Sequence, residues 1–184
     1  DGRPPAEVAY DILLERDGKE LIFLPFTNYT SRNHDTIREM MTDDQALFGL
    51  GDGGAHCGLI CDASIPTYLL THWVRDRARG DRLPLEWIVH RQTQANAKFF
   101  GLNDRGALAP GMKADVNVID FDGLQLCPPH IVRDLPAGGR RLIQEAQGYI
   151  ATVQTGAVTF EHGEHSGALP GGVIRGQQKG PTAA

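Results

Sequence analysis

Hydrophobic residues over the first hundred positions follow a helical spacing in some stretches and continuous, strand-like runs in others. A first helix is predicted from Pro5, which suits the first helical turn, to Gly18, which suits a helix end. The apolar run Leu21 to Leu24 stops at a proline and is typical of a buried strand. A second helix is expected to begin at Asn33 or Asp35, because both residue types favour the N-cap position.

The same alternation continues to residue 101. Ala46 to Leu50 predicts a second buried strand, and Ser64 and Pro84 mark the starts of two further helices, the last ending at Gly101. The predicted buried faces of these two helices consist of Leu69, Leu70, Trp73, Val74, Leu85, Ile88, Val89 and Ala95. This strand–helix order favours parallel strands covered by helices. Two such strands do not make a stable sheet, so the first half is expected to be the end of a larger α/β barrel or sheet.

Beyond residue 101 the pattern changes to alternation with a period of two, interrupted by turn residues. Residues 107–109 and 115–120 predict one β-hairpin, and residues 149–153 and 158–160 predict a second one. A loop rich in proline and glycine is expected between the hairpins, over residues 127–139. The second half of the chain is therefore expected to be rich in β-structure.

The composition excludes several classes of protein. The chain has 184 residues, of which 41% are hydrophobic, enough for a packed core in one domain or two small ones. The net charge is −5 and no basic run exceeds two residues, so no nucleic-acid partner is expected. No apolar run approaches the ~20 residues of a membrane span, and no signal peptide is visible. Three cysteines, an odd number, indicate no disulfide framework and favour a cytoplasmic protein with reduced thiols.

The most informative position is Asp52, which stands between Gly51 and Gly53-Gly54 directly after the second predicted strand. Functional side chains of α/β barrels and sheets collect at the carboxyl ends of the strands. A carboxylate there is suited to bind a metal ion or to accept a proton from metal-bound water. His56 follows four residues later, within reach of the same pocket. A structural role, in which Asp52 caps the following turn, stays open because Asp-Gly pairs are common in loops.

Further candidates lie elsewhere along the chain. Tyr29 and Arg32 follow the first predicted strand and share its face with Asp52, and an arginine is suited to bind a substrate carboxylate. A solvated loop is the alternative for both. His162 and His165 have a metal-like spacing, but the turn predicted there favours an exposed polar loop. The arginines from 75 to 82 alternate with aspartates and are expected to face solvent.

Five segments resemble a known superfamily. Residues 49–56 (GLGDGGAH) are similar to the strand-eight segment of the amidohydrolase superfamily. Residues 93–102 (TQANAKFFGL) and 104–116 (DRGALAPGMKADV) resemble its passage from barrel into β-domain. Residues 134–139 (DLPAGG) and 167–171 (GALPG) are similar to segments of one branch, the N-acyl-D-amino-acid deacylases or D-aminoacylases. The resemblance spans nearly the whole chain.

The resemblance implies a fold, a cofactor and a reaction. Residues 1–101 would be the last βα units of a metal-dependent hydrolase with a (β/α)₈ TIM barrel, and residues 102–184 part of a small β-sandwich domain with a C-terminal tail. The parent enzyme would be a zinc-dependent hydrolase of carbon–nitrogen bonds other than peptide bonds, acting on N-acyl-D-amino acids. Asp52 would be a zinc ligand and the general base for the attacking water, and His56 would line the site.

The chain departs from the family pattern because it has no His-x-His pair, and its seven histidines do not replace the missing ligands. The zinc site is therefore expected to be incomplete in this chain, and the isolated chain to be inactive. The missing N-terminal portion of the same enzyme is the expected partner, and unpaired strand edges also suit a homo-oligomer. Two alternatives remain: a cyclic-amide hydrolase of the dihydroorotase or hydantoinase type, and a non-catalytic β-rich interaction domain in which Asp52 is structural.

Overall fold

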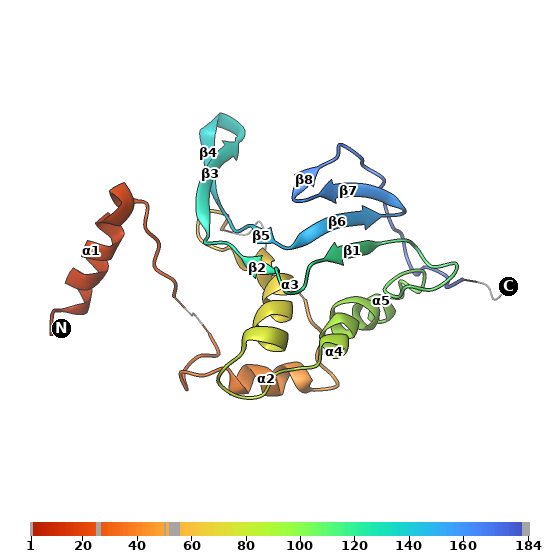
Figure 1. Ribbon diagram of the computed structural model, residues 1–184, viewed down its shortest axis with the longest axis horizontal. Helices are drawn as coiled ribbons and strands as arrows, with labels where there is room; N and C mark the ends of the chain where they lie inside the picture. The colour runs from red at the N-terminus through yellow and green to blue at the C-terminus, as the bar shows by residue number, and fades with distance from the viewer. Residues whose placement is uncertain (1, 25–26, 50, 52–55, 182–184) are drawn as a thin grey trace. The chain divides into compact units, whose positions relative to one another are not determined.

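The computed structural model describes residues 2–24, 27–49, 51 and 56–181 (Figure 1). The chain forms two compact units, Asp1–Asp43 and Asp44–Ala184, and each has its own helices. Within the described ranges, no helix combines the length and the apolar character needed to cross a membrane.

The first unit contains two helices, α1 (Pro5–Gly18) and α2 (Asp35–Thr42). Helix α2 confirms the sequence prediction, and α1 confirms it in part, because Glu15, Arg16 and Asp17 near its end have non-helical backbone angles. Proline occupies the first helical position of α1, and the Asn33 side chain accepts a hydrogen bond of 3.1 Å from the N–H of Asp35 at the start of α2. Neither helix has a buried residue. The two helices therefore do not make a core of their own.

Residues 21–24 of the first unit are irregular, so the strand predicted there is wrong. Their side chains are exposed, from 38% for Leu21 to 84% for Phe23. A buried strand needs partners for its backbone groups and cover for its side chains. The described part of this unit contains no other strand that could supply them.

Two helical runs carry the core of the second unit. The first consists of η1 (Asp62–Ser64), α3 (Ile65–Tyr68) and the π-helical η2 (Leu69–Asp76). The second consists of α4 (Leu85–His90), the π-helical η3 (Arg91–Ala95) and α5 (Asn96–Phe99). The buried apolar side chains of these runs and their connection are Leu69, Leu70, Trp73, Leu83, Ile88 and Ala97. Both helix predictions are confirmed, although Val89 on the expected buried face is 44% exposed.

The main sheet is antiparallel, with the strand order β1 (Val116–Ile119), β6 (Tyr149–Gln154), β7 (Ala157–Glu161) and β8 (Glu164–His165). The β6–β7 pair confirms the second predicted hairpin. The first predicted hairpin is wrong, because residues 107–109 form no strand and β1 pairs with β6 instead. Strand β6 is rich in β-branched and aromatic residues, whereas residues 107–109 read Ala-Leu-Ala, which favours a strand less.

The described residues also form two smaller antiparallel strand pairs. These are β2 (Gln125–Leu126) with β5 (Ala146–Gln147), and β3 (His130–Leu135) with β4 (Gly139–Ile143). The turn η4 (Pro136–Gly138) joins β3 to β4, with positive φ angles at Ala137 (57°) and Gly138 (73°). The loop predicted over residues 127–139 is therefore wrong for most of its length. The fold is mixed α/β, and the described strands form no closed barrel.

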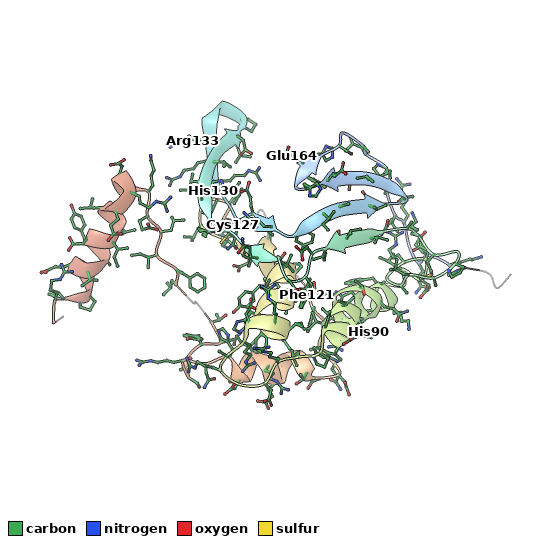
Figure 2. All side chains as sticks on the ribbon, in the orientation of Figure 1. His90, Phe121, Cys127, His130, Arg133 and Glu164 are labelled. Atoms are coloured by element: carbon green, nitrogen blue, oxygen red, sulfur yellow. The ribbon has the colours of Figure 1, made fainter. Side chains whose placement is uncertain are left out.

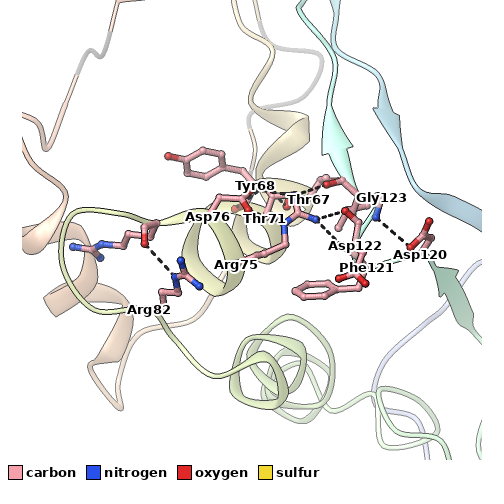
Figure 3. A network of polar contacts seen from close by, with 12 residues as sticks. Thr67, Tyr68, Thr71, Arg75, Asp76, Arg82, Asp120, Phe121, Asp122 and Gly123 are labelled. Atoms are coloured by element: carbon pink, nitrogen blue, oxygen red, sulfur yellow. Dashed lines mark hydrogen bonds and ion pairs between the residues drawn. The ribbon is translucent and has the colours of Figure 1, made fainter.

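Arg75 joins the first helical run to the turn between β1 and β2 (Figure 3). Its Nη1 donates to the carbonyl oxygens of Phe121 (2.5 Å) and Asp122 (3.1 Å), and its Nη2 donates to that of Leu124 (2.7 Å). The same guanidinium forms an ion pair with Asp76. Hydrogen bonds with a charged donor are stronger than neutral ones. The prediction that this arginine faces solvent is therefore wrong.

Arg77 is also packed rather than solvated. It is only 3% exposed, and its guanidinium lies 4.5 Å from the centre of the Trp73 ring. Its Nε donates to the carbonyl oxygen of Arg79 (2.7 Å). Long arginine stems pack well on apolar surfaces and aromatic rings, which the charge pattern of the sequence does not show.

Candidate functional site

Residues 46–49, which lead towards Asp52, are held by side chains of the second helical run. Arg91 donates a hydrogen bond to the carbonyl oxygen of Ala46, and Asn96 Nδ2 donates to that of Phe48 (2.7 Å). In a strand, such carbonyl groups would accept bonds from a neighbouring strand. The strand predicted over residues 46–50 is therefore wrong for the described residues 46–49, where arginine and amide donors take the place of a backbone partner.

The ring of Phe48 fixes the same segment through aromatic contacts. It meets the Trp87 ring edge-on, with ring centres 5.6 Å apart. The Arg91 guanidinium lies 5.5 Å from the Phe48 ring centre and 5.3 Å from that of Trp87. Contacts of this kind each add a modest stabilisation to burial alone. The Phe48 side chain thus packs residues 46–49 against α4 and η3.

An open hollow of about 360 Å³ borders this segment. Its lining is mostly apolar and consists of Phe48, Gly49, Gly51, Ala63, Ile65, Pro66, Leu69, Gln92 and Asn96. Gln92 Nε2 donates to the carbonyl oxygen of Pro66 (3.4 Å), whereas Asn96 Oδ1 is buried and accepts no hydrogen bond in the described structure. Hollows of this size with few polar groups suit small apolar ligand groups.

Gly51, directly before Asp52, packs against the start of the first helical run. A Cβ added at this position would lie 2.5 Å from the carbonyl oxygen of Asp62 and 3.1 Å from the Cα of Ala63. Real Cβ atoms do not approach backbone so closely, so any other residue would force a shift. Glycine at position 51 therefore allows the backbone of Asp62 and Ala63 to approach closely.

Asp52 and its neighbours 53–55 lie outside the described residues, so the roles of Asp52 as metal ligand and general base stay predictions. His56 lies in an exposed turn and has a φ of 42°. Its carbonyl oxygen accepts hydrogen bonds from the N–H groups of Leu59 (2.7 Å) and Ile60 (3.2 Å). This tight turn fixes the backbone of the loop that follows Asp52 in sequence.

Tyr29 and Arg32 belong to the first unit and share one irregular loop. The N–H of Arg32 donates to the carbonyl oxygen of Tyr29 (2.9 Å), and the Tyr29 and His34 rings lie 5.2 Å apart. Arg32 has a positive φ of 53°, which is unusual for a residue other than glycine. The structure therefore brings these two residues together, while His56 belongs to the other unit. Their contacts with a substrate stay predictions.

The described residues contain no group of three or more His, Cys, Asp or Glu side chains that could hold a metal ion. These residues alone do not fit a zinc centre, which needs at least three protein ligands. The pair His162 and His165 is exposed, and His165 Nδ1 accepts a hydrogen bond of 3.0 Å from the N–H of Gly167. This confirms the prediction of an exposed polar turn there. Burial, with a smaller effect of Asp62, raises the pKa of the Cys61 thiol and disfavours the thiolate that metal binding requires.

The loop after His56 is attached to the β3–β4 hairpin. The N–H of Leu142 donates to the carbonyl oxygen of Cys57 (2.6 Å), and the Cys57 thiol lies 4.0 Å from the carbonyl oxygen of Arg140. The loop predicted over residues 127–139 covers most of this hairpin, and that prediction does not include its place beside residues 56–60. The available signal was the pair of apolar stretches on either side of the turn at residues 136–138.

Comparison with known proteins adds three findings. The sequence model of the Amidohydrolase family matches residues 16–160 of this chain. A 5-methylthioadenosine/S-adenosylhomocysteine deaminase from Pelotomaculum thermopropionicum is 37% identical in an alignment of 89 residues that covers 46% of this chain and 20% of that protein. The match thus spans about a fifth of the relative's length. No solved structure matches.

Proposed function

The chain belongs to the amidohydrolase family, and from that premise we propose that it is the C-terminal portion of a metal-dependent enzyme that removes the acyl group from N-acyl-D-amino acids. The observation that carries the proposal is that the family match runs through the Asp52 segment. The narrower substrate is supported by the resemblance of residues 134–139 and 167–171 to the D-aminoacylase branch. The parent fold in this proposal is a TIM barrel, with residues 1–101 as its last βα units and residues 102–184 in the β-domain.

In the complete enzyme, Asp52 would accept the proton of the water that attacks the scissile amide. Asp52, together with ligands from the rest of the enzyme, would hold a zinc ion, and that ion would supply the Lewis acidity that polarises the amide and lowers the pKa of the water. The remaining ligands would come from the rest of the enzyme, since the described residues hold no set of three. His56, Tyr29 and Arg32 would line the substrate pocket, and the apolar hollow beside Gly51 would accept the acyl chain. The 184-residue chain alone would show no turnover.

A second candidate reaction is hydrolytic deamination. It is favoured by the identity shared with the deaminase from P. thermopropionicum. Both reactions break a carbon–nitrogen bond, but deamination releases ammonia and deacylation releases a carboxylic acid. The products therefore separate the two proposals.

The test is a substrate panel on the zinc-loaded complete enzyme. N-acetyl-D-leucine, its L enantiomer, hydantoin and 5-methylthioadenosine are supplied separately, and acetate, ammonia and the ring-opened product of hydantoin, N-carbamoylglycine, are measured. The proposal expects acetate from the D enantiomer and at most a small rate with the L enantiomer. Ammonia from 5-methylthioadenosine would replace the proposal with the deaminase reading, and ring opening of hydantoin would replace it with a cyclic-amide hydrolase.

A further inference from the structure

The C-terminal segment, residues 176–181, returns to the end of the second helical run. Leu102 and Gln178 form a parallel β-bridge. The N–H of Gln178 donates to the carbonyl oxygen of Gly101 (2.8 Å), and the carbonyl oxygen of Gln178 accepts from the N–H (3.3 Å) and the Nδ2 (3.2 Å) of Asn103. Figure 2 shows this segment beside the loop that follows α5, with side chains of both gathered there. The segment thus binds residues 101–103 as a short strand would.

Two glycines allow the C-terminal segment to approach this closely. Gly101 has a φ of 69°, and a Cβ added there would lie 2.7 Å from the Gln177 Cγ. Gly111 has a φ of 82°, and a Cβ added there would lie 2.7 Å from the Pro181 Cβ. Side chains at these two positions would push the segment away, so the glycines keep its docking surface open.

Helix α5 ends in a Schellman motif at the place where this segment binds. The N–H of Leu102 donates to the carbonyl oxygen of Ala97 (2.8 Å), and the N–H of Gly101 donates to that of Lys98 (3.0 Å). Gly101, with its positive φ, occupies the left-handed position that closes such a helix end. Its carbonyl oxygen accepts the N–H of Gln178, so the C-terminal segment holds the residue that caps the helix.

The last turn of α5 has little burial of its own. Ala97 is the buried residue of α5, whereas Phe99 and Phe100 are 67% and 66% exposed. The carbonyl oxygen of Asn96 accepts the N–H of Phe100 (3.1 Å), and the Asn96 side chain binds the carbonyl oxygen of Phe48 (2.7 Å). A helical turn with few buried contacts opens readily unless its cap is held. The bond between Asn96 and Phe48 therefore depends on the same turn that the C-terminal segment contacts.

The C-terminal segment is attached by hydrogen bonds rather than by burial. Gln178 is half-buried, and the other residues of the segment are exposed. The Gln178 side chain donates to the carbonyl oxygen of Gly176 (3.2 Å), within the segment itself. Segments with few buried apolar contacts open at a lower free energy than the core of a protein. Residues 176–181 can therefore leave residues 101–103 while the helical core stays packed.

We propose that residues 176–181 are a removable strap that orders the last turn of α5 and, through Asn96, residues 46–49. When the strap is docked, Gly101 is held and the Asn96 amide stays on the carbonyl oxygen of Phe48. When the strap leaves, the last turn frays and that hydrogen bond opens. The segment that leads towards Asp52 is thus ordered or released by a part of the chain that is distant in sequence. This inference holds whichever reaction the complete enzyme catalyses.

The first test follows amide exchange by NMR in the 184-residue chain and in its Gln178→Pro variant. Proline removes the N–H that donates to Gly101 and suits an extended backbone. Exchange is expected to become roughly 3- to 10-fold faster, the usual weight of one lost hydrogen bond. The amides that report it are the backbone N–H groups of Gly101 and Leu102 and the side-chain amide of Asn96.

Two controls make this result specific. The backbone N–H groups of Leu83 and Ile88, both hydrogen-bonded, report the helical core and should exchange at an unchanged rate. Lys179→Pro is the matched variant, because the Lys179 N–H has no hydrogen-bond partner among the described residues. It should leave every one of these signals unchanged.

The proposal is overturned if Gln178→Pro changes nothing, or if the two proline variants act equally. Faster exchange at the capping residues with a constant Asn96 side chain overturns it as well, because the link to residues 46–49 is then absent.

A second variant ends at Arg175 and so lacks the strap. Exchange at the same three amides should become about 10-fold faster or more, since the bonds of both Gln178 and Asn103 are lost. The core amides of Leu83 and Ile88 should keep their protection. If they lose it, residues 176–181 belong to the core and are no removable strap. Protection that rises with chain concentration would place the segment on a second copy and would overturn the proposal too.

Discussion

Two parts of the unit Asp44–Ala184 are stabilised in different ways. The helical runs from Asp62 to Phe99 pack through buried apolar side chains, with Ile88 fully buried and Trp73 2% exposed. Residues 46–49 and Gly51 are held instead by polar donors from one helical run, one aromatic ring and one glycine contact. The segment that leads to the predicted catalytic carboxylate therefore depends on a few directed contacts, whereas the helices depend on burial.

This difference shows what each part requires from its surroundings. The two helical runs bury apolar side chains that all lie within the stretch Asp62–Phe99. A barrel strand forms hydrogen bonds with neighbouring strands on both edges. In the described structure, the carbonyl groups of residues 46–49 instead accept hydrogen bonds from the side chains of Arg91 and Asn96. The comparison predicts that damage to the helical core lowers global stability, while damage to the segment acts locally.

The largest expected effect comes from Ile88→Ala in α4. The side chain is fully buried, so its removal leaves a cavity and should lower the free energy of unfolding by about 2–5 kcal/mol. Chemical denaturation of the 184-residue chain measures it. Val89→Ala is the matched control, because Val89 is 44% exposed and should cost less than about 1 kcal/mol. Equal losses in the two variants would mean that α4 is not packed as described.

The next effect concerns Gly148→Ala, before β6. An added Cβ would meet the Leu124 Cα at 2.6 Å and its N at 2.8 Å, and the φ of 96° disfavours any other residue. Steric strain and backbone strain together should cost about 2–4 kcal/mol. Gly156→Ala has a similar φ of 81° but open space around its Cβ, and should cost only about 1–2 kcal/mol. The difference between their denaturation midpoints isolates the steric part; a zero difference contradicts the close approach of Gly148 to Leu124.

Arg75→Met tests the joint between helices and strands. It keeps the apolar stem but removes three hydrogen bonds to the carbonyl oxygens of Phe121, Asp122 and Leu124. Stability should fall by about 2 kcal/mol, since bonds from a charged donor contribute about 1.5–3 kcal/mol. Arg175→Met, at an exposed position, should leave the melting temperature unchanged. A neutral result for Arg75→Met would show that the turn at residues 120–124 keeps its place without this side chain.

The smallest global effect is expected for Asn96→Ala, which removes the donor to the Phe48 carbonyl oxygen. We expect a loss of about 1 kcal/mol in the free energy of unfolding. Amide exchange should quicken at residues 46–51 and stay constant in α4, because the bond holds only that segment. Gln92→Ala, which removes the longer bond to Pro66 (3.4 Å), is the control and should leave residues 46–51 unchanged. Uniform quickening across the helices would contradict the proposed local role of Asn96.

The features that could be predicted from sequence depend on neighbours along the chain. Helices α1, α2 and α4 follow from capping residues and helical spacing, and the β6–β7 hairpin follows from alternation around a short turn. Pairing of β1 with β6 joins Val116 to Val153, and no local signal selects that partner. The same limit explains Arg75, whose partners lie 46 to 49 residues away.

In the candidate site, too, the features that could be predicted are local in sequence and the others depend on distant contacts. Asp52 was identified from a short motif and a resemblance, both of which are local, and Gly51 was identified with it. The attachment of β4 to Cys57 joins residues 85 positions apart, and the charge pattern of residues 130–143 gives no indication of it. Contacts of such range are fixed by the fold as a whole, so they became visible only with the structure.

The most direct test of the account is Asp52→Asn in the zinc-loaded complete enzyme, assayed with N-acetyl-D-leucine. The amide keeps the shape of the carboxylate but cannot take a proton, so kcat should fall about 10²- to 10⁴-fold while the melting temperature stays the same. The measurement is acetate release under saturating substrate, beside a melting curve of each protein. Unchanged kcat would contradict the catalytic role of Asp52 and favour a structural one.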